Sequence, residues 1–235
     1  MMLLKLETLG KDLLNLFFPR LCPACGAAAL PDSLEFCLQC EVNLPYTNYH
    51  LLDENPFTVR FWGRLPIVHG TAMMAFSKGG RTQRVLHAIK YKNRKDLALY
   101  LGQSYGRSLL QAPAYEKTDL ILPVPLHPRR LRERGYNQSA FFAQGLSAAM
   151  GVPWAEKYLS RKAYTVTQTQ KSRIERFSNV EGAFSLQYAG ELAGKQILLV
   201  DDVLTTGATL EACGSMIVEV PGVKLSLATL AIANS

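Results

Sequence analysis

Two adjacent carboxylates and a threonine-rich loop are the residues of this chain whose types and spacing point to chemistry. Asp201 and Asp202 follow the apolar run 197–200. The loop after them consists of small and hydroxyl-bearing residues: Thr205, Thr206, Gly207, Ala208 and Thr209. Carboxylates accept hydrogen bonds from sugar hydroxyls, whereas hydroxyl and backbone N–H donors at a helix start bind phosphate. The pattern predicts a site for a phosphorylated sugar, with Mg²⁺ as a natural third component.

A strand and a helix must position this site. Four consecutive apolar residues bounded by turn signals are typical of a buried parallel strand, so we expect the strand to end where the carboxylates begin. Residues 210–218 have apolar positions at helical spacing, which places the loop at a helix N-terminus, where unpaired N–H groups favour an anion. Neither a Walker sequence nor Gly-x-Gly-x-x-Gly is present. An incidental acidic pair beside a capped helix is the alternative reading.

The segment 200–209, Val-Asp-Asp-Val-Leu-Thr-Thr-Gly-Ala-Thr, resembles the phosphoribosyl pyrophosphate (PRPP) loop of type I phosphoribosyltransferases. The resemblance implies an α/β fold, with a type I phosphoribosyltransferase-like parallel sheet flanked by helices. It also implies that Asp201 and Asp202 hold the ribose hydroxyls and that the loop 205–209 holds the 5′-phosphate. Mg²⁺ is expected to bind together with PRPP.

A second apolar strand is predicted at 119–124, and it runs into a proline- and arginine-rich loop, 125–138. Loops at the carboxyl ends of parallel strands face the ligand side of open α/β sheets. Comparison with phosphoribosyltransferases implies that residues 124–129 face pyrophosphate, which makes His127 and Arg129 candidate ligands. A structural role for His127 is the alternative.

The segment 161–184 is long, polar and basic, and we expect it to be a mobile lid while no anion is bound. Its Thr-Gln-x3-Arg-x2-Arg tract, which begins at Thr169, resembles the flexible catalytic loop of glutamine-dependent amidophosphoribosyltransferases. In a working enzyme, Lys171 and Arg173 would stabilise charge on the leaving pyrophosphate while Asp202 orients the ribose. Those amidotransferases expose an N-terminal cysteine nucleophile, but this chain begins with Met1, so we expect no glutamine hydrolysis.

Four of the five cysteines form two Cys-x2-Cys pairs: Cys22, Cys25, Cys37 and Cys40. Two such pairs complete the tetrahedral S4 shell that Zn²⁺ prefers in structural sites, and this shell leaves no open position for catalysis. Disulfides are the alternative, but a reducing cytoplasm favours zinc. The fifth cysteine, Cys213, falls on the predicted helix after the loop and is expected in the core.

The composition allows one large domain and a small one in 235 residues, of which 48% are hydrophobic. The predicted division is an amphipathic helix at 1–20, a zinc ribbon at 21–48, a linker at 49–70 and a phosphoribosyltransferase-like domain at 71–235. Charged residues within 1–20 argue against a membrane span or a signal peptide, so we expect a cytoplasmic protein without stable membrane insertion. Weak docking of this helix on a membrane or partner is the alternative to packing on the main domain.

The formal net charge of +7 favours an anionic partner, although phosphate ligands and nucleic acid satisfy it equally. One basic group falls between two predicted helices, 81–91 and 96–110, and consists of Lys90, Lys92, Arg94 and Lys95. These cations either form a solvated connection or contact phosphate or DNA.

The cysteine pairs, together with segments 123–128, 134–138 and 200–209, resemble the ComF family of competence proteins. This resemblance implies a zinc ribbon on a phosphoribosyltransferase-like domain and participation in DNA uptake during natural transformation. One hypothesis is an accessory protein that binds PRPP or a phosphorylated nucleotide and handles single-stranded DNA or a competence helicase. The other is an active Mg-dependent phosphoribosyltransferase that transfers the phosphoribosyl group of PRPP to a base or amine. Many enzymes of this fold are dimers, so a homodimer is one expectation.

Overall fold

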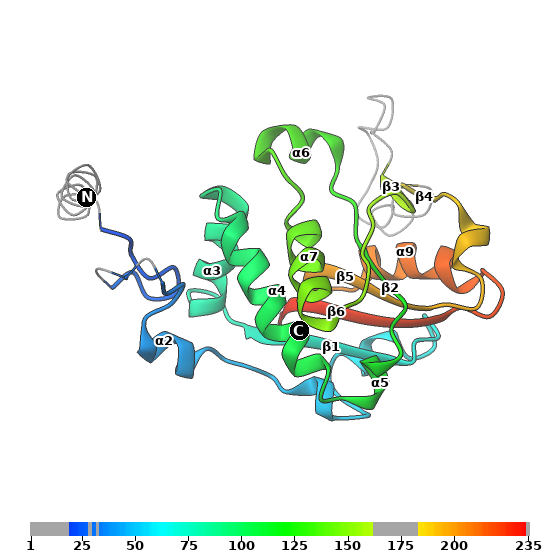
Figure 1. Cartoon of the computed structure of the whole chain (residues 1–235), viewed down its shortest axis with the longest axis horizontal. Helices are drawn as coiled ribbons and strands as arrows, with labels where there is room; N and C mark the ends of the chain where they lie inside the picture. The colour runs from blue at the N-terminus through cyan, green and yellow to red at the C-terminus, as the bar shows by residue number, and fades with distance from the viewer. Residues whose placement is uncertain (1–18, 28–29, 32, 162–182, 234–235) are drawn as a thin grey trace, which may run out of the picture.

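A four-stranded parallel sheet lies at the centre of the computed structural model, which describes residues 19–27, 30–31, 33–161 and 183–233. The strand order is β1-β6-β5-β2 (Figure 1). The strands are β1 (His69–Phe76), β2 (Leu120–Pro123), β5 (Gln196–Leu204) and β6 (Lys224–Ala233). A separate antiparallel pair consists of β3 (Leu159–Arg161) and β4 (Phe184–Leu186). The predicted parallel sheet is confirmed.

Helices cover both faces of the sheet, as predicted. The described α-helices are α2 (Leu38–Asn43), α3 (Arg81–Tyr91), α4 (Lys95–Leu109), α5 (Pro113–Glu116), α6 (Pro128–Arg134), α7 (Gln138–Met150) and α9 (Ala208–Val218). Short 3-10 helices are η1 (Tyr49–Leu51), η2 (Thr58–Phe61) and η4 (Ala189–Leu192). Successive residues of β5 point to opposite faces, so Leu198 packs with α3, α4 and α7, while Leu199 packs with α9.

Helices α4 and α7 approach each other closely through glycines. A β-carbon at Gly145 of α7 would clash with the carbonyl of Leu99, and one at Gly102 of α4 would clash with the carbonyl of Phe142. Residues without a side chain are therefore needed on both sides of this contact. The contact fixes α7, whose N-terminus carries Gln138 and Ser139 to the carboxyl edge of the sheet.

The segment predicted as a linker, 49–70, contributes to the core on the α9 side. Phe57 and Phe61 are fully buried there, and Leu65 is 5% exposed. The cysteine-rich segment shares the other core, because Phe36 and Cys40 pack in the same apolar cluster as α3 and α4. The boundaries of the four predicted segments stay a prediction, and residues 1–18 of the first lie outside the described residues. Within the part of the chain that the structure describes, no helix has the length and hydrophobicity of a membrane span.

Strand β5 is longer than the sequence predicts. We expected it to end at Val200, but it continues to Leu204, so both carboxylates lie inside the strand. The reason is that its two neighbours end at different points. Residues of β2 pair with β5 only as far as Val200, whereas β6 pairs with it as far as Leu204. The last four residues of β5, 201–204, therefore have no β2 residue beside them.

Candidate functional site

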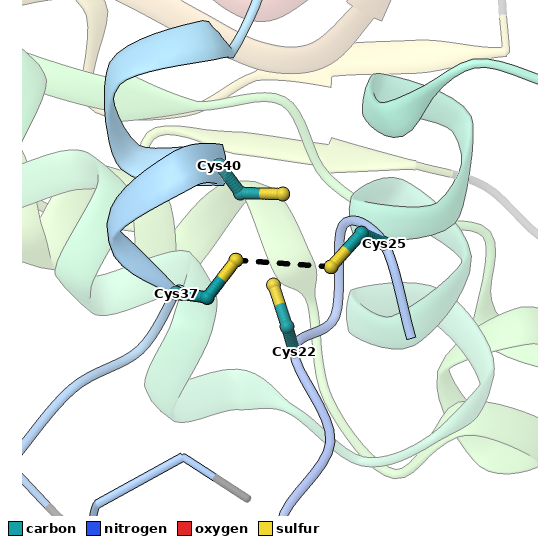
Figure 2. Close-up of side chains that lie close together, drawn as sticks. All are labelled: Cys22, Cys25, Cys37 and Cys40. Atoms are coloured by element: carbon teal, nitrogen blue, oxygen red, sulfur yellow. Dashed lines mark hydrogen bonds between the residues drawn. The ribbon is translucent and has the colours of Figure 1, made fainter. Parts of the chain in front are cut away.

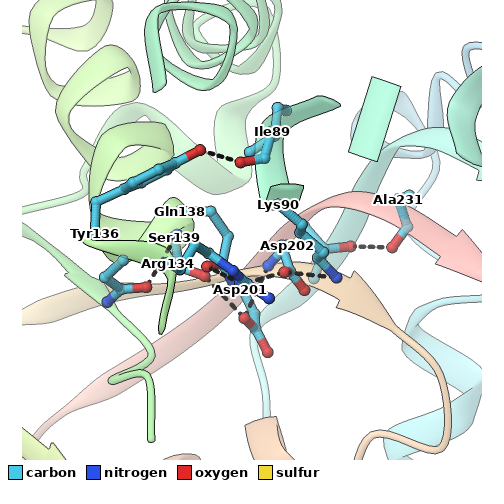
Figure 3. Close-up of polar contacts among 11 residues, drawn as sticks. Ile89, Lys90, Arg134, Tyr136, Gln138, Ser139, Asp201, Asp202 and Ala231 are labelled. Atoms are coloured by element: carbon cyan, nitrogen blue, oxygen red, sulfur yellow. Dashed lines mark hydrogen bonds and ion pairs between the residues drawn. The ribbon is translucent and has the colours of Figure 1, made fainter. Parts of the chain in front are cut away.

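The acidic pair lies in this last part of β5, next to the N-terminus of α7 (Figure 3). Asp201 Oδ1 accepts hydrogen bonds from Ser139 Oγ at 2.9 Å and from the backbone N–H of Asp202 at 2.8 Å. Asp202 Oδ2 accepts one from Gln138 Nε2 at 2.6 Å and forms an ion pair with Lys90 Nζ at 2.8 Å. Each carboxylate keeps acceptor capacity beyond these contacts, as binding of vicinal sugar hydroxyls requires.

The surroundings of Asp201 disfavour its ionised form. Burial raises its pKa to about 7, the charge of Asp202 adds to this effect, and the hydrogen bonds from Asp202 N–H and Ser139 partly oppose it. Two adjacent carboxylates in a partly desolvated site repel each other, so a ligand that donates hydrogen bonds or a nearby cation relieves the repulsion. The arrangement thus favours a hydroxyl-rich or cationic ligand.

A cavity of about 230 Å³ lies over the acidic pair. From the predicted sugar-phosphate segment, its lining includes Asp201, Asp202, Thr205 and Thr209. The cations that line it are Lys90, Arg130, Arg134 and Arg161. Carboxylates, hydroxyls and cations within one hollow provide acceptors for a sugar and positive charge for phosphate groups.

Residues of the segment 49–70 contact the threonine loop and hold its backbone in place. Gly207 has a φ of 85° and caps α9, and a β-carbon at this position would lie 3.2 Å from the ring of Phe61. The Arg60 guanidinium donates to the carbonyl of Thr205, and Arg64 Nη1 donates to that of Thr206 at 3.1 Å. The loop conformation therefore depends on residues far away in sequence.

Residues 128–134 form helix α6, whereas we expected a loop. The start and end signals are local: His127 is the N-cap, Pro128 follows at the first helical position, and Gly135 ends the helix with a φ of 80°. His127 Nδ1 accepts from the N–H of Arg129 at 3.2 Å. Partial burial, followed by the charge of Arg161 and neighbouring arginines, lowers the pKa of His127, which favours a neutral, acceptor-competent ring.

The two candidate pyrophosphate ligands do not belong to the described lining of the cavity. Arg129 is exposed and pairs with Glu133 on the next turn of α6, with 2.8 Å between Nε and Oε1. His127 serves α6 as a cap, in agreement with the structural alternative. Their role as ligands stays a prediction.

The lid residues Lys171 and Arg173 lie outside the described residues, as does the rest of 162–182. Strands β3 and β4, which flank this segment, pair with each other through Arg161 and Phe184. The Arg161 guanidinium lies over the Phe184 ring at 4.9 Å, and Arg161 lines the cavity. The described residues on either side of this segment therefore lie together at one edge of the site.

Several site residues were not predicted. Gln138, Ser139, Arg134 and Arg161 reach the cavity, and Lys90 was predicted only as one of a basic group. A usable signal for Gln138 and Ser139 was their position directly after Asn137, whose Oδ1 caps α7 by accepting from the N–H of Ser139 at 3.2 Å.

The four paired cysteines converge on one point (Figure 2). Their sulfur atoms all lie within 4.8 Å of one another, and Cys25 Sγ is 3.7 Å from Cys37 Sγ. A tetrahedral Zn–S shell has sulfur–sulfur separations of roughly 3.8 Å, whereas a disulfide requires about 2.05 Å. The thiols are free and could hold a metal such as zinc.

Cys22 and Cys40 of the cluster differ in how easily their thiols lose a proton. Burial would raise the pKa of Cys22, but backbone N–H groups of Cys37, Cys25 and Ala24 lower it to about 7. Burial and the surrounding sulfur atoms raise the pKa of Cys40 to about 12. A cation is required to hold four thiolates this close together. Cys213 is buried on α9, as predicted for a core residue.

Comparison with known proteins relates this chain to a domain family and to named relatives. A family model for the phosphoribosyl transferase domain matches residues 137–235. The DNA utilization protein YhgH of Escherichia coli O157:H7 is 31% identical over 198 residues, which cover 81% of this chain and 80% of that protein. Competence protein F of Haemophilus influenzae is 37% identical over 100 residues, or 42% of this chain and 44% of that protein.

Among solved structures, the glutamine PRPP amidotransferase of B. subtilis is similar at 22% identity, with a TM-score of 0.39. The similarity covers 60% of this chain and 30% of the length of that enzyme.

Proposed function

Because this chain belongs to the ComF family of competence and DNA utilization proteins, we propose that it binds PRPP or a related phosphoribosyl ligand and takes part in DNA uptake. The observation that carries the proposal is the cavity in which Asp201 and Asp202 lie together with Thr205 and Thr209. These residues stand at the carboxyl end of a parallel strand and at the start of α9, where phosphorylated ligands bind in open α/β sheets.

In this proposal each group has a separate task. Asp201 and Asp202 accept hydrogen bonds from the two ribose hydroxyls, and the loop 205–209 donates to the 5′-phosphate. Arg130, Arg134 and Arg161 lie on the same cavity and offer cations to a diphosphate. Mg²⁺, bound with PRPP, would supply further neutralisation of the diphosphate charge.

The cysteine cluster is proposed as a structural zinc site. Its four ligands fill a tetrahedral shell, so the metal has no open position for substrate. The cluster packs against α3 and α4 in one core, which lets the metal stabilise the face of the domain that carries Lys90. Single-stranded DNA, a competence helicase and a second copy of the chain are the proposed partners, within the cytoplasm.

An active phosphoribosyltransferase is the second candidate. The observation in its favour is that three guanidinium groups line the cavity of the acidic pair, where charge grows on a leaving pyrophosphate. Lys171 and Arg173 would join them if the segment 162–182 closes over the ligand. A base or amine would then attack C1 of the ribose, and the C1–O bond to pyrophosphate would break.

Calorimetric titration of PRPP, with and without Mg²⁺, tests the binding proposal. We expect the zinc-loaded protein to bind PRPP and the Asp201→Asn/Asp202→Asn variant to lose at least about 99% of the affinity, which corresponds to about 2.7 kcal/mol. Equal heats from both proteins would disprove the sugar-phosphate site. Release of pyrophosphate in the presence of Mg²⁺ and an acceptor base distinguishes the enzyme from the binding protein.

A further inference from the structure

Helix α3 carries exposed basic and aromatic side chains on the face that points away from the core. Arg84, His87 and Tyr91 follow one another at spacings of three and four residues, so they share one side of the helix. Tyr91 is 69% exposed, and its ring centroid lies 4.9 Å from that of His87. An exposed tyrosine of this kind offers a flat surface for stacking.

Two hollows flank this face of α3. One, of about 430 Å³, lies between α3 and the cysteine-rich segment, and its lining includes Leu21, Cys22, Arg84, His87 and Lys92. The other, of about 500 Å³, lies between α3 and α6, and its lining consists of Lys90, Tyr91, Asn93, Arg130, Glu133 and Arg134. Figure 1 shows α3 between the cysteine-rich segment and α6.

The second hollow continues into the cavity of the acidic pair. Lys90, Arg130 and Arg134 line both. The hollow beside the cysteine-rich segment is lined by His87 and the hollow beside α6 by Tyr91, and these two rings lie 4.9 Å apart. A ligand that crosses both rings would reach from the cysteine-rich segment to the cavity of Asp202. We call the residues along this line, Arg84, His87, Tyr91, Lys92, Arg130 and Arg134, the α3 track; Arg134 is half-buried and the others are exposed.

The charge balance of the α3 track is positive. Arg94 borders the α3 track, but its charge is balanced by ion pairs with Glu35 and Asp96, so we do not include it among the cations that a ligand could meet. Glu133 is the acidic residue in the lining of the α6 hollow, and it pairs with Arg129 at 2.8 Å. The Arg134 guanidinium lies 5.5 Å from the centroid of the Tyr91 ring, so cation and aromatic face are adjacent. The ligand of such a surface combines phosphate groups with flat rings.

We propose that single-stranded nucleic acid binds along the α3 track, with a base stacked on Tyr91 and phosphates on Lys92 and Arg130. A duplex fits this chemistry poorly, because its bases are stacked on each other and do not expose a face to Tyr91. Tyr91 does not itself line the cavity of the acidic pair, although Arg134, which contacts its ring, does. The idea that the strand reaches the acidic pair rests on the proposed function, since it uses the cations shared with that cavity.

Fluorescence anisotropy with a labelled oligothymidylate tests the stacking contact on the full zinc-loaded chain. We expect Tyr91→Ala to lower the affinity about tenfold and Tyr91→Phe to stay within about twofold of wild type, because phenylalanine keeps the ring. Trp62→Ala is the matched control, since Trp62 is 60% exposed but lies off the α3 track, and it should leave the affinity unchanged. An oligomer of abasic sites should bind wild type and Tyr91→Ala equally.

The salt dependence of binding tests the phosphate contacts. Arg130→Gln should make the slope of log affinity against log salt shallower by about 0.7, as expected for one lost contact to a single strand. Arg132→Gln is its control, because Arg132 is also exposed on α6 but lines neither hollow, and it should leave the slope as in wild type.

Three results would overturn the proposal: wild-type affinity in Tyr91→Ala, equal affinity of wild type for abasic and thymidylate oligomers, or equal affinity for duplex and single strand. PRPP titration into Tyr91→Ala separates this outcome from failure of the proposed function, because PRPP binding is expected to be unchanged there.

Discussion

Lys90 of α3 and Asp202 of β5 form an ion pair, with 2.8 Å between Nζ and Oδ2. The two side chains are only 23% and 10% exposed. The acidic residue predicted to hold a ribose hydroxyl is thus already held by a cation from another element. A sugar must share Asp202 with Lys90 or displace it, so the pair couples the position of α3 to the state of the site.

This ion pair should be energetically coupled. Asp202→Asn leaves the ammonium of Lys90 without its carboxylate, and we expect a loss of about 1 to 3 kcal/mol in the free energy of unfolding, since Lys90 is partly open to solvent. Lys90→Met should cost a similar amount. The double variant should cost less than the sum, as measured by urea unfolding in a double-mutant cycle. Additive losses would show that the pair contributes nothing of its own.

Asp201 should make the free energy of unfolding of the ligand-free protein fall as the pH rises. Its pKa in the folded chain is about 7, above the usual value for an aspartate, through burial and the charge of Asp202. Between the two pKa values the folded chain holds a proton that the unfolded chain has lost, so the free energy of unfolding falls as the pH rises through this window. The fall ends above about pH 7, where both states are ionised.

Asp201→Asn should remove this dependence. The variant keeps a neutral side chain at every pH, so we expect it to be more stable than wild type near about pH 8 and equal to it near about pH 4. Denaturant unfolding at several pH values measures the difference. A constant offset between the two proteins across the range would contradict the raised pKa. Stabilisation by Asp201→Asn together with loss of PRPP binding would indicate that the site sacrifices stability for its ligand.

Local signals predicted the elements well where packing agrees with them. The expected helix 81–91 has the same bounds as α3, because apolar residues such as Val85 and Ile89 recur at helical spacing and become its buried face. The expected strand 119–124 differs from β2 by one residue at each end. The acidic pair and Thr205 and Thr209 were predicted together, because they are close in sequence.

Features that depend on distant partners were not predictable from these signals. The length of β5 is set by where β2 and β6 stop, and the sequence of β5 does not contain this information. The support of Thr205 by Arg60 joins residues 145 positions apart. Helix α6 was different, because its proline start and glycine end were present in the sequence, but the arginine-rich composition was interpreted as a loop.

Removal of the metal should destabilise the core around α3 and α4 as well as the cysteine-rich segment. Cys22 and Cys40 pack in one apolar cluster with α3 and α4, so loss of zinc should loosen that core. We expect Cys40→Ser to lose the zinc that wild type binds, about one ion per chain, and to melt at a lower temperature. Cys213→Ala should keep its zinc, because Cys213 is buried on α9 away from the cluster. Zinc content by mass spectrometry and thermal melting provide the measurements, and an unchanged zinc content in Cys40→Ser would rule out the S4 site.

Arg60 should affect binding at the proposed PRPP site without contacting the ligand. Its guanidinium donates to the carbonyls of Thr205 and Ala233, and this joins the threonine loop to the end of β6. Loss of a hydrogen bond from a charged group typically lowers the free energy of unfolding by about 1.5 to 3 kcal/mol. Here we also expect the threonine loop to shift, because Arg60 holds the carbonyl of Thr205. We expect Arg60→Met to weaken PRPP binding about tenfold, because donors that shift by a fraction of an ångström no longer meet the 5′-phosphate.

A matched control and a second readout keep this prediction separate from general destabilisation. Arg107→Met changes an exposed arginine in the last turn of α4, far from the loop in sequence, and should leave both PRPP binding and melting temperature unchanged. Titration of PRPP into Arg60→Met should be done well below its melting temperature, so that the chain is folded. If affinity is unchanged there while the melting temperature falls, Arg60 only stabilises the fold. If affinity falls in the folded variant, the segment 49–70 belongs functionally to the phosphate site, because it sets the conformation of the loop that binds phosphate.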